Sequence, residues 1–400
     1  MKVNYKCCIV GGGPAGVMLG YIMAKFGIEV VVLEKHKDFF RDFRGDTIHP
    51  STMNILQQLG ILEDFLKIPH DKTPKISAKF GDKEFTVADF TQLDILTPYI
   101  AFTPQWNFLN FLTEKGKQLE HFNLMMETKV IDLIKEDGNV VGVKAINPEG
   151  ELSILSALVV GTDGRHSITR EKAQFTINSL GSSIDVLWFR VLKHKNDKKQ
   201  AFLNANNGNL LILIDRNDYW QCGLIVQKGG YDFIKEKGIQ YLRQELTNII
   251  PELKNNIEDI TSFEQVKNLD VKVDRLEKWY TEGLICIGDA AHAMSPIGGV
   301  GVNLAIQDAV AAANVLVPIL KTGKPTQRDL QKIQERRMYP TTFTQSVQVL
   351  IQNKSLQPFL GNKKKQNAPS ILKLFQWVPF LRKLPARFIG LGIRAEKIEL

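Results

Sequence analysis

The sequence has little cysteine, and its few cysteines follow no metal-binding spacing. Four occur among 400 residues, which is too few for a disulfide scaffold. All four, Cys7, Cys8, Cys222 and Cys286, lie inside apolar runs typical of strands. The sequence also lacks the C-x-x-C and H-x-x-x-H spacings that hold metal ions. We therefore expect reduced, packed thiols in a cytoplasmic protein and no metal site.

Long uncharged apolar runs are also missing. No stretch reaches the roughly 18 apolar residues that a membrane span needs, and residues 1–10 show no small-residue cleavage site of a secretory signal. Hydrophobic residues make up 44% of the chain and charged residues 24%, a balance that excludes a disordered or fibrous protein. We expect a soluble protein, and the length favours two domains.

Acidic residues are scarce only in the last part of the sequence. The formal net charge is +8, but residues 321–400 hold sixteen Lys and Arg and only four Asp and Glu. Because the basic character is confined to this segment and no nucleic-acid-reading motif occurs, a nucleic-acid partner is excluded. Residues 363–395 mix basic with large apolar side chains. Peripheral contact with an anionic membrane and a helical cap over a substrate cavity both stay open for this segment.

A glycine-rich turn follows the first predicted strand. The pattern predicts a strand over residues 3–10, a helix over 17–26 and a second strand over 28–33. Gly11-Gly12-Gly13-Pro14-Ala15-Gly16 joins the first strand to the helix, and Glu34 closes the second strand. This arrangement is typical of a dinucleotide site. By itself it does not choose between FAD and NAD.

Residues of this turn have distinct physical roles in such a site. Gly11 permits the tight turn, Gly13 lets the backbone approach a pyrophosphate, and Gly16 lets the helix pack closely on the strand. Unpaired N–H groups at the helix start attract phosphate, and the Glu34 carboxylate accepts hydrogen bonds from ribose hydroxyls. The predicted dinucleotide contacts in this unit are Gly11, Gly13, Pro14, Ala15, Gly16, Glu34 and Lys35.

Two more turns that contain glycine and aspartate follow predicted strands. Residues 158–170 combine a strand, an Asp163-Gly164 turn and the start of a helix. Residues 283–292 combine a strand with a Gly288-Asp289 turn, and residues 293–303 supply a P-x-G-G-x-G-x-N stretch before a long apolar helix. Such turns place polar groups and bare backbone at strand ends, where ligands of α/β proteins bind.

In this order and spacing, the turns resemble those of the class A FAD-dependent monooxygenases of the para-hydroxybenzoate hydroxylase fold. The shared motifs, which span residues 11–303, are the G-x-G-x-x-G turn, the D-G-x-x-S-x-x-R set of Asp163, Gly164, Ser167 and Arg170, and G-D-A-A-H with P-x-G-G-x-G-x-N. Residues 44–50 also resemble the segment in which the family places an arginine near the flavin. The implied fold is α/β, with a Rossmann-like, GR2-type FAD-binding domain, a discontinuous antiparallel-sheet substrate domain and a C-terminal helical segment.

The resemblance also assigns residues to the cofactor. Asp289 would bind the ribityl chain, the glycines after residue 296 would let backbone press against the isoalloxazine ring, and Pro296 would hold a carbonyl over the reaction cavity. His292 is expected to be structural or to lie near the phosphates. The FAD contacts implied beyond the first unit are Arg44, Gln105, Asp163, Gly164, Gly288, Asp289, Pro296, Gly298, Gly299, Val300, Gly301 and Asn303.

His49 lies five residues after Arg44 in the same stretch. On a loop that crosses the flavin face it would act as an acid, a base or a substrate contact, so His49 and Pro296 are the predicted catalytic positions. The alternative is a helix-entry residue ahead of Pro50 and the cap-like Ser51.

The implied reaction is a hydroxylation. In the family, NADPH or NADH reduces FAD, O2 adds to the flavin as a C4a-hydroperoxide, and its distal oxygen passes to an aromatic, phenolic or polycyclic small molecule. A tetracycline-type drug-inactivating monooxygenase, and a hydroxylase or reductase of a quinone or isoprenoid at a membrane surface, are alternatives. A halogenase is disfavoured because W-x-W-x-I-P is absent. A flavin-binding scaffold without turnover is the non-enzymatic alternative, and the oligomeric state stays open.

The remaining pattern predicts a second, mostly antiparallel sheet built from two separated segments, with one helix over residues 231–248. The expected domains are FAD-binding (1–75, 101–175 and 268–330), substrate-binding (76–100 and 176–267) and C-terminal helical (331–400). Candidates for the pocket, equally compatible with a core, are Phe189, Leu211, Leu213, Trp220, Gln221 and Leu224.

Overall fold

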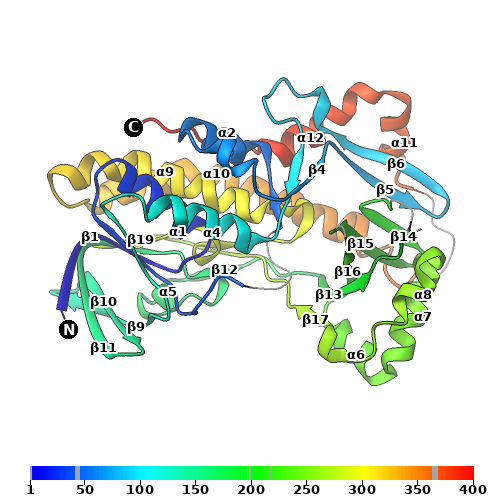
Figure 1. Cartoon of the computed structure of the whole chain (residues 1–400), viewed down its shortest axis with the longest axis horizontal. Helices are drawn as coiled ribbons and strands as arrows, with labels where there is room; N and C mark the ends of the chain where they lie inside the picture. The colour runs from blue at the N-terminus through cyan, green and yellow to red at the C-terminus, as the bar shows by residue number, and fades with distance from the viewer. Residues whose placement is uncertain (1, 41–45, 196, 198–199, 217, 363–367) are drawn as a thin grey trace.

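Two large sheets organise the chain, with long helices along the first and shorter helices on the second (Figure 1). The computed structural model describes residues 2–40, 46–195, 197, 200–216, 218–362 and 368–400. Arg44, one of the predicted cofactor contacts, lies outside the described residues.

The first sheet is built around parallel strands. β1 pairs in parallel with β2 and β11, and β8 and β20 extend the parallel pairing on either side. The order is β19-β20-β11-β1-β2-β8, while β9 and β10 continue from β11 as antiparallel strands. The strands are β1 (Lys2–Val10), β2 (Val30–Leu33), β8 (Phe122–Met125), β9 (Lys129–Glu136), β10 (Asn139–Asn147), β11 (Gly150–Gly161), β19 (Tyr280–Thr281) and β20 (Leu284–Cys286).

Each face of this sheet has its own core. In β2, Val30 and Val32 belong to the cluster with the helices, whereas Val31 and Leu33 pack with β9 and β10. Strand side chains alternate between faces, and a strand covered on both sides is therefore apolar throughout. The helices on the first face are α1 (Pro14–Lys25), α4 (Gln105–Gly116) and α9 (Gly301–Thr322), with α10 (Gln327–Ile351) beside α9 (Figure 1).

Helix α9 is long and apolar enough to cross a membrane by length and composition alone. However, 78% of its most apolar window is buried inside the protein. Its buried side includes Ile306, Val310 and Leu316, which belong to the same core as α1. We therefore describe α9 as a core helix.

The second sheet joins two distant segments of the chain in the order β17-β13-β16-β15-β14-β5-β6. The pairing is antiparallel except between β14 and β5, so the predicted two-segment sheet is present. Its strands are β5 (Lys75–Phe80), β6 (Lys83–Asp89), β13 (Ile184–Leu192), β14 (Leu203–Asn206), β15 (Asn209–Asp215), β16 (Tyr219–Gln227) and β17 (Lys267–Leu269).

Three helices cover one face of the second sheet, namely α6 (Gly230–Lys237), α7 (Ile239–Ile249) and α8 (Lys254–Ile257). The single helix predicted over residues 231–248 is wrong in one respect. Gly238 has φ +87° and separates α6 from α7, a backbone conformation that favours glycine.

The pocket candidates divide between the two faces of this sheet. Five of them pack in the core beneath α7, together with Leu242 and Leu246: Phe189, Leu211, Leu213, Trp220 and Leu224. Gln221 alternates with its neighbours on β16 and points to the opposite face, where it contacts Asp46. The core alternative therefore holds for the five apolar candidates.

The C-terminal helices lie against the outer strands of the second sheet (Figure 1). α11 (Ser370–Trp377) and α12 (Lys383–Gly390) contact β6, and Phe359, Leu360 and Ala386 join the core of the sheet face opposite α7. The other elements of two or more residues near the site are β3 (Thr47–Ile48), α2 (Pro50–Gln58), α3 (Leu62–Phe65), β4 (Asp71–Thr73), β7 (Ile100–Phe102), α5 (Ile168–Lys172), β12 (Ile177–Ser179), β18 (Asp274–Leu276) and β21 (His292–Ala293).

Gly16→Ala tests the close packing of α1 on the first sheet. A Cβ at Gly16 would lie 2.0 Å from Gly11 O and 2.5 Å from Thr162 Oγ1, so the helix would have to shift. We expect a loss of about 3 kcal/mol in the free energy of unfolding, measured by urea denaturation. Gly323→Ala is the control, because its Cβ would meet nothing within 4 Å. Equal stability of the two variants would contradict this packing.

Candidate functional site

Strand register brings the three glycine-containing turns to one edge of the first sheet. Val10 lies opposite Gly161, and Gly161 lies opposite Cys286. The turns that follow β1, β11 and β20 therefore leave the sheet side by side. The carboxyl edge of a parallel sheet is where ligands of α/β proteins bind.

The first turn is fixed by a hydroxyl from the neighbouring strand. Gly11 has φ +111°, and a Cβ there would lie 2.6 Å from Thr162 O. Thr162 Oγ1 donates to Gly11 O at 2.7 Å. The β1–α1 turn and the end of β11 therefore form one rigid unit, in which Gly11 and Gly16 cannot carry a side chain.

The N-terminus of α1 is open for an anion. Gly13 is the N-cap, and among the described residues no side chain caps this helix or places an acid in its first turn. A Cβ at Gly13 would meet only Thr162 O, at 3.9 Å, which leaves room above the turn. The free N–H groups and the positive end of the helix dipole fit a diphosphate at this point.

Glu34 presents an oriented carboxylate at the end of β2. Its Oε2 accepts from Gly12 N at 3.0 Å and its Oε1 accepts from His36 N at 3.0 Å. A carboxylate oriented at the end of a strand fits the hydroxyls of a ribose. Lys35 beside it is exposed.

Asp163 organises its own loop. Its Oδ1 accepts from Ser167 Oγ at 2.6 Å and from Thr169 Oγ1 at 2.8 Å, and its Oδ2 accepts from Thr169 N at 3.1 Å. Ser167 also accepts from Arg170 N at 3.0 Å and so caps α5. Gly164 follows Asp163 with φ +80° and lies in a short 3-10 turn.

Gly288 and Asp289 lie beside this loop. Gly288 N donates to Asp308 Oδ2 at 3.0 Å, which fixes the turn to α9. The Asp289 side chain is about one-third exposed, and its Oδ2 lies 3.7 Å from Arg165 Nη2. The side chain of Asp289 is thus accessible at the same edge as Gly13 and Glu34.

Asp308 is the centre of a buried ionic network. It accepts from His292 Nε2 at 2.6 Å and from Arg337 Nε at 2.7 Å, and Arg337 Nη1 reaches Glu396 Oε1 at 3.3 Å. Burial by itself raises the pKa of Asp308, but His292 and Arg337 outweigh it and hold the pKa below its usual value. His292 therefore makes a structural contact here, and a structural role is one of the two that were expected for it.

The glycine stretch after Pro296 bends the chain into α9. Gly298 and Gly299 have φ +78° and +63°, and a Cβ on Gly299 would lie 2.7 Å from Thr47 Oγ1. Val300 is the N-cap of α9, Gly301 is its first residue, and no side chain caps this helix among the described residues. The bare backbone and the positive helix end fit an electron-rich ring edge.

Asn303 connects α9 to the segment that crosses the site. Its Oδ1 accepts from His49 N at 2.9 Å and from Thr52 Oγ1 at 2.7 Å, and its Nδ2 donates to Thr47 O at 3.2 Å. All three bonds join Asn303 to other residues of the chain. Asn303 thus positions residues 47–52.

His49 is fully buried at the N-cap of α2, directly ahead of Pro50. Its Nδ1 lies 2.7 Å from Ile389 O of α12, and its Nε2 has no hydrogen-bond partner among the described residues. Burial lowers the pKa of His49 to about 4, so the ring is neutral and Nδ1 donates. This is the location that the helix-entry alternative describes, and a catalytic role for His49 stays a prediction.

A buried polar cluster faces the same segment from the second sheet. Asp46 Oδ2 accepts from Gln221 Nε2 at 2.6 Å and lies 2.9 Å from Arg216 Nη2. The Asp46 carboxylate also accepts from the backbone of Gln105, and burial raises its pKa against the opposing effect of Arg216. Gln105 opens α4. We call Asp46, Arg216 and Gln221 the polar cluster.

Sequence reasoning missed two members of the polar cluster. Asp46 lies in the 44–50 stretch, two residues after Arg44, and this position could have marked it as a candidate site residue. Arg216 directly follows β15, and an arginine at the end of a strand is ordinarily a surface residue. Only the pairing of β15 with β16 and the fold of residues 46–48 bring the three side chains together.

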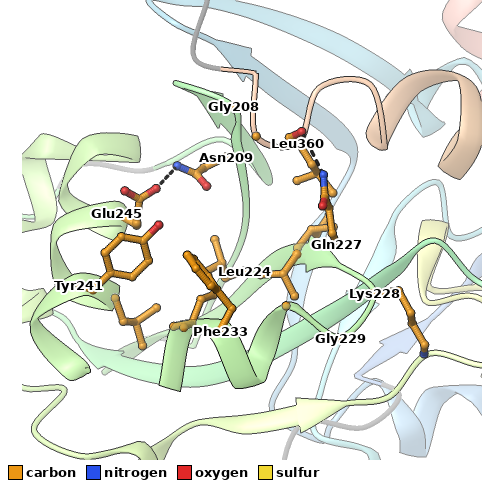
Figure 2. A pocket seen from close by; sticks show the side chains of 16 residues that line it. Gly208, Asn209, Leu224, Gln227, Lys228, Gly229, Phe233, Tyr241, Glu245 and Leu360 are labelled. Atoms are coloured by element: carbon orange, nitrogen blue, oxygen red, sulfur yellow. Dashed lines mark hydrogen bonds between the residues drawn. The ribbon is translucent and has the colours of Figure 1, made fainter. Parts of the chain in front are cut away.

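A cavity of about 320 Å³ lies elsewhere, on the second sheet. Figure 2 shows Phe233 and Tyr241 at its side and Asn209 facing Glu245, with an Asn209 Nδ2 to Glu245 Oε2 distance of 2.6 Å. Of the pocket candidates only Leu224 lines it, and none of the predicted cofactor contacts does. It is separate from the edge that carries the glycine turns.

Comparison with known proteins agrees with this geometry. The family described as FAD binding domain matches residues 4–345. The chain belongs to the class A FAD-dependent monooxygenases. This monooxygenase is 30% identical over 345 residues to 6-methylpretetramide 4-monooxygenase of Streptomyces rimosus, a match that covers 86% of this chain and 82% of that protein. It is an oxidoreductase, and FAD is its cofactor.

Two solved structures share the fold of this monooxygenase. The p-nitrophenol 4-monooxygenase of Pseudomonas putida superposes with a TM-score of 0.79 at 20% identity, covering 98% of this chain and 100% of that one. Anhydrotetracycline hydroxylase of Streptomyces rimosus superposes with a TM-score of 0.75 at 20% identity, covering 98% and 77%.

His49→Asn tests the buried neutral ring in this monooxygenase. The pKa of His49 in the folded protein, about 4, lies below the ordinary 6.5. The stability that the neutral ring contributes is therefore fully present above about pH 6.5 and is lost as the pH falls toward 4. The amide of Asn can keep the bond to Ile389 O without titrating. We expect the parent's free energy of unfolding to fall by about 3 kcal/mol more than the variant's across this range. Equal slopes in pH-dependent urea titrations would contradict the assignment.

Proposed function

We propose that this monooxygenase uses NADPH or NADH and O2 to hydroxylate an aromatic, phenolic or polycyclic small molecule that carries polar groups. The observation that carries the proposal is the polar cluster, a buried carboxylate, guanidinium and amide on a sheet face that is otherwise apolar. Buried polar groups in such a wall orient a ligand that offers hydroxyl or carbonyl partners. The relative that acts on 6-methylpretetramide supports a polycyclic substrate by its name.

FAD would be held at the carboxyl edge of the first sheet. The α1 N-terminus and Gly13 would bind the diphosphate, Glu34 the adenosine ribose, and Asp289 the ribityl chain. The bare backbone at 298–301 would lie against the ring system. The remaining assigned contacts are Gly11, Pro14, Ala15, Gly16, Lys35, Arg44, Gln105, Asp163, Gly164, Gly288, Pro296 and Asn303. When bound, FAD would accept electrons from the reduced nicotinamide and activate O2.

The side chains of this chain then bind and orient the substrate. Arg216 and Gln221 would donate to its oxygen atoms, and Asp46 would hold the Arg216 guanidinium in place through the ion pair. Apolar residues of the same sheet face, among them Ile214 and Ile225, would keep water from the reacting atoms. Pro296 would offer its carbonyl to the substrate side of the cavity. His49 would fix the segment through its Nδ1 bond to Ile389 O, and its Nε2, which has no partner among the described residues, would be the atom that takes part in proton transfer.

The domain division and the compartment belong to the same proposal. We assign residues 1–75, 101–175 and 268–330 to a GR2-type FAD-binding domain, 76–100 and 176–267 to the substrate domain, and 331–400 to the C-terminal segment. The separate cores of the two sheets support this division. The four free, buried cysteines support a cytoplasmic location.

A drug-inactivating monooxygenase of tetracycline type is the second candidate. The names of two similar proteins, which act on 6-methylpretetramide and anhydrotetracycline, support a tetracycline-like substrate for it. The two activities differ in whether the enzyme acts on a biosynthetic precursor or on the finished antibiotic.

Product analysis under labelled dioxygen tests the reaction class. We expect one labelled oxygen atom in the product when purified FAD-containing protein turns over phenols, polycyclic aromatic ketones or tetracyclines with NADPH or NADH. Product formation must match nicotinamide consumption, because a ligand that only uncouples the flavin would give peroxide instead. Turnover that reduces a polyprenyl substrate without incorporation would overturn the proposal.

The Asp46→Asn/Arg216→Gln double variant tests the polar cluster. Both charges are removed together, so no buried charge is left unpaired. We expect KM for the substrate to rise about 10- to 100-fold, while FAD content and substrate-free nicotinamide oxidation stay at the parent level. Lys267→Gln, an exposed change on the same sheet, is the matched control. An unchanged KM in the double variant would remove the cluster from substrate binding.

A further inference from the structure

The C-terminal helices expose large apolar side chains. α11 turns Leu372 inward, where it packs with Phe85. Ile371, Leu374 and Trp377 recur every three residues and therefore share the other side of the helix, and all three are exposed. Trp377, at 86%, has the most exposed large apolar side chain among the described residues.

The same surface continues past the end of α11. Phe380, in the short 3-10 turn Pro379–Arg382, is 68% exposed, and Leu384 of α12 is 63% exposed. Surface apolar residues usually occur singly, and a contiguous set of this size marks an interaction site. We call the set the C-terminal patch; its members are Ile371, Leu374, Trp377, Val378, Phe380 and Leu384.

The patch is bordered by positive charge. Residues 370–391 contain Lys373, Arg382, Lys383 and Arg387 and no acidic residue. Lys373 and Arg387 are exposed. An apolar surface whose own segment carries only basic charged side chains is complementary to a surface that is apolar inside and negatively charged outside.

The patch is held in place by the protein beneath it. Gln376 Nε2 donates to Glu84 O at 3.1 Å, and Gln92 Nε2 donates to Pro379 O at 3.1 Å. Arg382 Nε donates to Phe375 O at 2.9 Å, which ties the 3-10 turn to α11. The apolar side chains therefore project from a fixed scaffold that is tied down at several points.

We propose that the C-terminal patch docks this enzyme on the surface of an anionic lipid bilayer. Trp and Phe partition into the interface between headgroups and acyl chains, and neighbouring Lys and Arg are attracted by anionic lipids. A second copy of the chain is a poorer occupant, because a symmetric contact of the same patch would bring four positive charges against four. The contact is peripheral, since α9 is packed in the core. Residues 363–367, which belonged to the same expectation, lie outside the described residues.

Vesicle flotation tests the proposal on the FAD-loaded enzyme. The probes are vesicles of phosphatidylcholine alone and vesicles in which part of it is replaced by phosphatidylglycerol. We expect flotation with the anionic vesicles only, and its loss in high salt, because screening weakens the charge attraction. Absence of flotation with anionic vesicles at low salt overturns the proposal.

Two paired variants assign the binding to the patch. Trp377→Ser/Phe380→Ser should abolish flotation, and Lys373→Gln/Arg387→Gln should weaken it about 30-fold. The matched controls on α6 are Phe233→Ser, which removes a 53% exposed aromatic residue, and Lys235→Gln/Lys237→Gln. Both controls should float like the parent, and all variants should keep the parent's FAD content and melting temperature.

Two further outcomes contradict the proposal. If the α6 controls lose as much binding as the patch variants, the attraction comes from the charge or apolarity of the whole protein. If light scattering shows a dimer that Trp377→Ser/Phe380→Ser converts to a monomer, and vesicles do not compete with it, the patch is an interface between copies.

Discussion

The buried carboxylate of Asp308 is the contact on which the geometry of the site depends. One oxygen receives Gly288 N and His292 Nε2, and the other receives Arg337 Nε. A lone carboxylate at zero exposure would be costly, so the partners and the acid require one another. Through Arg337 of α10 the network reaches Glu396, so the turn at Gly288, α10 and the segment after α12 are joined by one set of bonds.

Bare backbone complements this network. The site needs close approach at Gly11, Gly16 and Gly299, where a Cβ would lie within 2.7 Å of another atom, and it leaves space at Gly13. Gly11, Gly16 and Gly299 allow close packing within the protein, while Gly13 leaves room for a ligand. The two kinds of glycine cannot be told apart in the sequence motif, because Gly11, Gly13 and Gly16 all belong to the same G-x-G-x-x-G turn.

Much of the cofactor site could be predicted from sequence because its parts are local. A strand, a turn and a helix start lie within a dozen residues, and periodicity together with glycine spacing is enough to place them. The Ser167 cap is of this kind. The break at Gly238 shows the limit, since a single glycine inside a helical pattern either stays in the helix or ends it.

The assembly of the polar cluster, and the face of the sheet on which each β16 side chain lies, depend on contacts between distant segments. Strand alternation predicts two faces, but which face meets the reaction cavity depends on the helices that cover the other one. Apolar residues such as Trp220 fit either face. Asp46 and Arg216 are 170 positions apart in the chain, and no local pattern links them. The burial of His49 depends in the same way on α12, which supplies Ile389.

The long separation between contacting segments has a consequence for biosynthesis. Strand β1 pairs with β11, which pairs with β20, and Arg337 meets Glu396. A ribosome must therefore translate past residue 396 before all of these contacts can form. Until then the early apolar strands lack their covering layers, and this interval is when the polypeptide is most exposed to aggregation.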